Sequence, residues 1–113
     1  MHELGLAGEI LDVVLSEARR NGARRVTAVA LRVGVLRAIE PEQLSFLFAH
    51  LARGTAADGA RMEILEDPVR VGCPACGASE ARRIVWECPR CRGSGVVATG
   101  GDALEVVSLE VCA

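Results

Sequence analysis

The sequence predicts an α+β fold with two helices, a few short strands and a cysteine-rich module inserted between strands. Three observations lead to this prediction. Apolar residues recur at helical spacing in two segments, they alternate with polar residues in neighbouring segments, and after residue 71 this periodicity gives way to two Cys-x-x-Cys pairs. A chain of 113 residues, of which 50% are hydrophobic, is long enough for one compact domain that carries such an insertion.

The first helix is expected from Leu4 to Ala18. Its charged residues fall opposite an apolar stripe, and the stripe consists of Leu4, Ala7, Leu11, Val14, Leu15 and Ala18. The pair Asn21-Gly22 ends the helix, because both residues tolerate a left-handed backbone. The two arginines just before this pair suit the negative end of the helix dipole.

Residues 25–33 predict a strand with two apolar faces, so we expect it at the centre of a sheet. A second helix follows, with Pro41 in its first turn and Gly54 beyond its end. Its buried stripe consists of Leu44, Leu47, Phe48 and Leu51. Phe46 lies off this stripe, and we expect it to pack in a secondary part of the core, with a contact to a partner protein as the alternative.

The second half of the chain predicts three extended segments. Residues 60–66 alternate in polarity, residues 69–71 follow Pro68, and residues 104–111 are rich in valine and leucine. The last segment is expected to return to the first sheet, which makes the cysteine-rich module an insertion between strands.

Composition limits the classes of partner. The net charge is −2, the sequence pI is about 5.7 and aromatic residues make up 3% of the chain, so neither nucleic acid nor a membrane surface is an expected partner. Charged residues and glycines interrupt the apolar stretches before they reach the length of a membrane span, and the N-terminal segment lacks the pattern of a secretory signal. We therefore expect a cytoplasmic protein.

In a reducing compartment, paired cysteines are better metal ligands than disulfides. Cys73 and Cys76 form one Cys-x-x-Cys pair, and Cys88 and Cys91 form the other. Two such turns present four thiolates to one zinc ion, and a site closed by four protein ligands is structural and not catalytic. Cys112 stands alone near the end of the chain and is expected to pack.

The cysteine module also carries four arginines, which raises the alternative that the chain is a zinc-ribbon module that binds protein or nucleic acid. The local charge argues against nucleic acid: Arg82, Arg83, Arg90 and Arg92 stand against Glu80 and Glu87, and a zinc ion with four thiolates contributes −2, so that the loaded module is about neutral. Trp86 is its one aromatic residue and is expected to cover the zinc site.

The chain begins Met1-His2-Glu3, which is a possible chelating sequence. The terminal amine, the amide nitrogens of His2 and Glu3 and the His2 imidazole can close fused rings in one plane, a geometry that suits Ni(II) or Cu(II) better than Zn(II). A terminal amine titrates at about 7.7 to 8.0, so it releases its proton to a metal at neutral pH. The Glu3 carboxylate is an additional candidate ligand.

With these features together, the chain resembles the HypA family of hydrogenase maturation proteins over essentially its whole length. The matching features are Met1-His2-Glu3, Val33-Gly34, Glu40-Pro41 with Leu44, Phe46 and Phe48, Gly59-Ala60, the four paired cysteines and Ser108-Leu109-Glu110. The resemblance implies a nickel domain, residues 1–70 completed by 102–113, with two helices on a three-stranded sheet. It also implies a zinc domain, residues 71–101, inserted before the last strand.

By the same resemblance, the protein is a nickel chaperone and not an enzyme. Nickel is its cargo, held by His2 and Glu3, and zinc is structural. The implied partners are a HypB-type GTPase and the hydrogenase large subunit, while self-association and service to another nickel enzyme such as urease stay open. Glu40 has two alternatives, a nickel-linked role or a position at the N-terminal cap of the second helix.

Overall fold

The computed structural model describes residues 2–113 and divides into two compact units. Unit 1 comprises the described residues up to Leu31, together with Ile39–Leu65 and Glu105–Ala113. Unit 2 comprises Arg32–Ala38 and Glu66–Leu104. Among residues 2–113, no helix has both the length and the apolarity that a membrane crossing requires.

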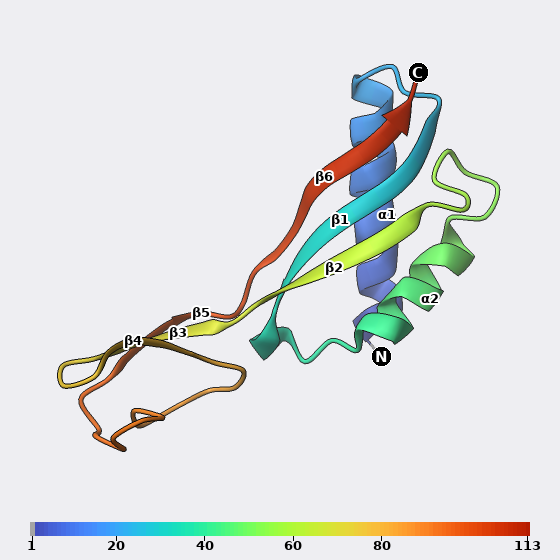
Figure 1. The fold of residues 1–113 in the computed structure, drawn as a ribbon. Coiled ribbons are helices and arrows are strands. Elements are labelled where there is room, and N and C mark those ends of the chain that lie inside the picture. The colour runs from blue at the N-terminus through green and yellow to red at the C-terminus, as the bar shows by residue number, and fades with distance from the viewer. Residues whose placement is uncertain (1) are drawn as a thin grey trace. The chain divides into compact units, whose positions relative to one another are not determined.

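Two helices and a three-stranded sheet form the first part of the fold (Figure 1). The helices are α1 (His2–Arg20) and α2 (Pro41–Leu51), which pack against each other. The sheet has the order β2-β1-β6, with β1 (Arg25–Gly34) at its centre between β2 (Arg61–Asp67) and β6 (Leu104–Cys112). The predicted α+β fold and the central position of the first strand are therefore confirmed.

Apolar burial explains why α1 forms and where it ends. Its buried residues are Ala7, Ile10, Leu11, Val14 and Ala18, which follow helical spacing. Leu4 continues the stripe into the first turn but is exposed, contrary to the prediction. The helix ends at Arg20, where Gly22 adopts a φ of 66° and Ala23 donates its amide to the Ala18 carbonyl.

The second helix starts at Pro41, whose fixed φ suits the first turn. Leu44 and Phe48 are buried on its inner side, one turn apart. Phe46 is 67% exposed, so the prediction that it packs in the core is wrong. At about 100° per residue, a side chain two positions from both Leu44 and Phe48 projects from the opposite side of the helix.

Unit 2 contains a second sheet, in the order β4-β3-β5. Its central strand β3 (Val69–Cys73) pairs antiparallel with β4 (Gly77–Ala81) and with β5 (Val97–Gly100). The sequence predicted only the first of these strands. The other two are short and rich in alanine, glycine and serine or threonine, so they lack the alternation that makes a strand visible in a sequence.

A close backbone contact fastens residues 32–38 to the rest of unit 2. Leu36, in the short 3-10 helix η1 (Val35–Arg37), donates its amide to the Gly101 carbonyl at 2.7 Å. A Cβ atom at Gly34 would overlap that same carbonyl. Gly101 has a φ of 82°, and a Cβ there would lie 2.7 Å from the Val69 Cγ2 atom. Both positions therefore require glycine.

Gly34→Ala should lower the free energy of unfolding by on the order of 2–4 kcal/mol, because the added methyl group meets backbone that cannot move aside. Gly8→Ala is the matched control, since Gly8 lies in α1 with nothing near its missing Cβ. This control should raise stability by up to about 1 kcal/mol. Urea denaturation followed by circular dichroism measures both changes, and equal stability of the two variants would contradict the proposed overlap.

Candidate metal centres

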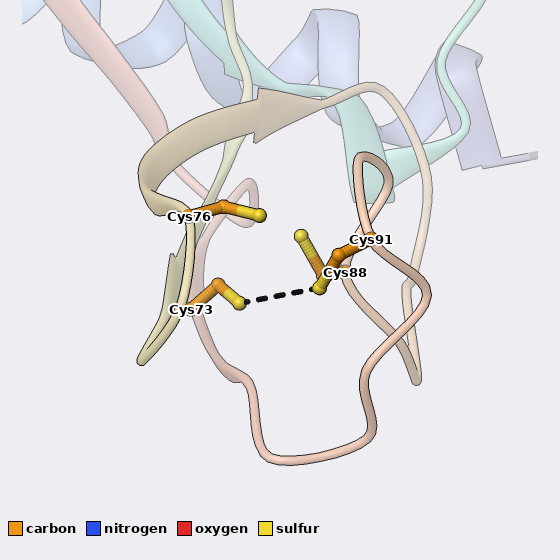
Figure 2. A group of neighbouring side chains, drawn as sticks. All are labelled: Cys73, Cys76, Cys88 and Cys91. Atoms are coloured by element: carbon orange, nitrogen blue, oxygen red, sulfur yellow. Dashed lines mark hydrogen bonds between the residues drawn. The ribbon is translucent and has the colours of Figure 1, made fainter.

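The four paired cysteines of unit 2 converge on one point (Figure 2). Cys73 ends β3, Cys76 lies in the turn before β4, and Cys88 and Cys91 come from the loop between β4 and β5. Their sulfur atoms all lie within 4.8 Å of one another. The structure thus brings together four thiols from two segments of the chain.

The sulfur positions fit a tetrahedral metal ion. Metal–sulfur bonds of about 2.3 Å in a tetrahedron place two sulfurs about 3.8 Å apart. The Sγ atoms of Cys73 and Cys91 are 3.7 Å apart, and all four thiols are free of disulfide bonds. The cluster can therefore hold one divalent ion that prefers thiolate ligands.

Backbone amides shape the second Cys-x-x-Cys turn. The Arg90 amide donates to the Cys88 sulfur and the Gly93 amide to the Cys91 sulfur, each at 3.4 Å. The turn is closed by 2.8 Å bonds from the Arg92 amide to the Cys88 carbonyl and from the Cys88 amide to the Gly93 carbonyl. Arg92 adopts a φ of 64° in this turn.

Two of the thiols have pKa values that are shifted in opposite directions. Hydrogen bonds from the Cys91 and Arg90 amides lower the pKa of Cys88 to about 6. A hydrogen bond with Cys91, together with burial, raises the pKa of Cys76 to about 12. Four thiolates this close repel one another, so a divalent cation is what makes full deprotonation favourable.

The second candidate centre lies at the start of α1. His2 is its first residue, with a side chain that is 61% exposed and an Nε2 atom 3.9 Å from the Glu3 Oε2 atom. Met1, whose amine belongs to the predicted ligand set, lies outside the described residues. Amides in the first turn of a helix have no carbonyl partner one turn earlier, so the His2 amide is not committed to the helix.

The Glu3 side chain connects this end of α1 to α2. Its carboxylate accepts a hydrogen bond from the Glu40 amide at 3.5 Å, and the side chain is only 13% exposed. Hydrogen bonds from its own amide and from Glu40 lower the pKa of the Glu3 carboxyl.

Glu40 occupies the N-cap position of α2 without capping it through its side chain, which is exposed. Of the two alternatives for Glu40, capping through its side chain is therefore not observed, and its amide donates to the Glu3 carboxylate instead.

Trp86 and Cys112 are more exposed than the sequence predicted. Trp86, predicted to cover the metal site, is 82% exposed, so that prediction is wrong. Cys112, predicted to pack, is exposed at the end of the edge strand β6. Trp86 lies in an irregular loop and Cys112 is the last residue of β6, so neither position lies within a periodic pattern that could report its burial.

Comparison with known proteins shows similarity over nearly the whole chain. The sequence profile of the family described as "Hydrogenase/urease nickel incorporation, metallochaperone, hypA" matches residues 1–111. The hydrogenase maturation factors HypA of Azotobacter vinelandii and Azotobacter chroococcum are 43% and 42% identical over 112 residues, which is 98% of this chain and 99% of each relative. The Ni metallochaperone HypA from Helicobacter pylori shares the fold with a TM-score of 0.69, at 21% identity, over 100% of this chain and 99% of that one.

Cys88→Ser should abolish stoichiometric metal binding by unit 2, because Cys88 is fully buried and its sulfur is one of the four donors. Cys112→Ser is the matched control and should retain the metal, since Cys112 lies outside the cluster. Metal per chain is measured by plasma mass spectrometry after gel filtration. Retention of metal by Cys88→Ser would show that the four-thiol site is wrong.

Glu3→Gln should lower the stability of the protein at neutral pH, because the charged acceptor at the Glu40 amide is lost. A carboxyl with a lowered pKa stabilises the fold above its ordinary pKa of 4.5, and this contribution disappears as the pH falls through the lower pKa of the folded state. The gap between wild type and variant should therefore close on acidification. Thermal unfolding across this pH range tests the effect, with Glu9→Gln on the exposed side of α1 as control; an identical response of the two variants would contradict the link to Glu40.

Proposed function

The chain belongs to the HypA family of nickel metallochaperones, and we propose that it carries one Ni(II) ion at its N-terminus for delivery to the large subunit of a nickel–iron hydrogenase. Delivery proceeds together with a HypB-type GTPase in the cytoplasm, where cysteine thiols remain reduced. The observation that carries the proposal is the family membership, combined with an exposed histidine at the first position of a folded helix.

The proposed nickel ligands are His2 and Glu3, with the terminal amine completing a planar set of nitrogen donors. Ni(II) accepts a planar, nitrogen-rich geometry that Zn(II) disfavours. Deprotonated amides are anionic, and the positive end of the helix dipole stabilises anionic groups in the first turn. The start of α1 therefore favours the form of the ligands that binds nickel.

Glu3 takes part through its amide nitrogen in this proposal. Its carboxylate is already held against the Glu40 amide, and it can stay there while the backbone nitrogen binds the metal. The same contact anchors the chelating sequence to α2, so the ligands are presented from folded structure. The exposed His2 imidazole stays accessible to a partner, which suits transfer of the ion better than a buried cage does.

The two units carry two different metal roles in this proposal. Unit 1 is the nickel-binding domain, and unit 2 is a zinc-binding domain in which Cys73, Cys76, Cys88 and Cys91 hold a structural Zn(II). Four thiolates leave no open position for an activated water, so this metal supports the fold and performs no reaction. Any nucleotide hydrolysis during delivery belongs to the GTPase.

A zinc-ribbon module without nickel function is the second candidate. It receives support from the same four-cysteine cluster, but it gives no role to His2 or to the contact between Glu3 and Glu40. A nickel titration separates the two candidates, because only the chaperone needs the N-terminal histidine.

His2→Ala should abolish binding of about one Ni(II) per chain in a calorimetric titration of the zinc-loaded protein with an unextended native N-terminus. His50→Ala is the matched control: His50 is the other histidine of the chain, is exposed on α2, and should bind nickel as the wild type does.

Circular dichroism and zinc content show whether each variant keeps its fold. Equal nickel binding by wild type and His2→Ala, or no binding by either protein, would rule out the N-terminal site. The zinc-ribbon candidate would then become the better account.

A further inference from the structure

Unit 2 exposes its tryptophan and an isoleucine side by side in the loop before the second Cys-x-x-Cys turn. Trp86 is 82% exposed and Ile84 is 57% exposed. Large apolar side chains in this state lose contact with water only when another molecule covers them. Tryptophan is also among the residues that contribute most to binding energy at protein interfaces.

These two side chains line a groove of about 600 Å³. Pro89 and the buried Cys88 line it as well, and Arg83 and Arg92 add their side chains. A second groove of about 440 Å³ shares Arg83 and Pro89 with the first. The surface is therefore a depression with both apolar and charged side chains in its lining, which a short segment that carries both kinds of side chain fits better than a flat protein face does.

The charged residues of the groove indicate which kind of segment it can bind. Among the described residues, Arg82 is paired with Glu66 through two hydrogen bonds of 2.6 and 2.7 Å, and the Arg90 guanidinium donates to the Cys76 carbonyl. Arg83 and Arg92 form no such contact within residues 2–113, and Glu87 is the one carboxylate that lines the first groove. Two guanidinium groups with open donors therefore line the same groove as the indole, and they suit carboxylates, which accept two parallel hydrogen bonds from arginine.

We propose that this groove, lined by Trp86, Arg83 and Arg92, is a docking site for a short acidic segment of a partner protein. Its carboxylates pair with the two arginines, and one apolar side chain covers the indole and Ile84. Single-stranded nucleic acid is less suited, because it stacks successive bases on several aromatic residues, whereas Trp86 is the one aromatic residue in unit 2. The inference is independent of nickel binding at His2, so either can fail without the other.

Part of the groove wall belongs to the second Cys-x-x-Cys turn. Arg92 follows Cys91 directly, and its amide is held by the Cys88 carbonyl at 2.8 Å. Pro89 lies inside the same turn. This part of the wall is held by backbone hydrogen bonds before a partner arrives, which lowers the entropy cost of docking.

The test uses the zinc-loaded full chain and the blocked hexapeptide Glu-Asp-Leu-Phe-Asp-Glu. Trp86 is the chain's one tryptophan, so intrinsic fluorescence reports this groove alone. Binding should move the emission to shorter wavelength and should weaken as salt increases. Arg83→Gln and Arg92→Asn should each reduce the affinity by about tenfold or more; asparagine is chosen at position 92 because it tolerates the left-handed backbone.

Arg19→Gln, on the exposed end of α1, is the matched control and should bind as the wild type does. Zinc content and circular dichroism confirm that each variant keeps its fold. Equal binding of a peptide with lysines in place of the acidic residues, tighter binding of a twelve-nucleotide thymidine strand, or no change of emission with the acidic peptide would each overturn the proposal.

Discussion

The convergence of four thiols on one point is the constraint on which unit 2 depends. Its buried apolar residues are only Val33, Val69, Val71, Cys73 and Cys88, so two of the five are members of the cluster itself. Such a small core supplies little hydrophobic stabilisation, and the short strands β4 and β5 contribute mainly backbone hydrogen bonds. Closure of the thiol cluster around a metal ion adds the stabilisation that the core lacks, because a small metal domain uses the free energy of metal binding to fold.

Unit 1 is organised in a different way, and this difference bears on the two metal roles that we propose. Helices α1 and α2 and the strand β1 bury large side chains that include Phe48, Leu31 and Leu44, so this unit has a hydrophobic core of its own. The start of α1 is therefore held by packing and by the contact between Glu3 and Glu40, and it needs no metal for its structure. A cargo ion at the proposed N-terminal site can enter and leave while the fold persists, whereas loss of an ion from the thiol cluster would remove the main support of unit 2.

Local sequence patterns predicted the helices and the strand that are marked by the spacing of apolar residues or by a residue typical of a helix start. The apolar stripe of α1, Pro41 at the start of α2 and the two apolar faces of β1 each gave the correct element. The patterns failed where burial depends on distant residues. Phe46 and Trp86 are apolar residues that no other element covers, and β4 forms only because β3 offers it a hydrogen-bonding edge. Gly34 and Gly101 lie far apart in the sequence, and their contact depends on how the chain returns after β5.

The sequence by itself determined which candidate metal ligands the chain carries, because the spacing of the Cys-x-x-Cys pairs and the position of His2 in the chain are the same in any conformation. It also determined the two helices and the central strand, whose periodicity reflects one buried face each. The tertiary structure decided that the four sulfur atoms lie within 4.8 Å of one another and that Glu3 accepts a hydrogen bond from the Glu40 amide. It also decided that Trp86 lines an exposed groove together with two arginines whose guanidinium groups have no partner among residues 2–113. These features are distances and exposures between segments remote in sequence, and only the packing of the folded chain sets them.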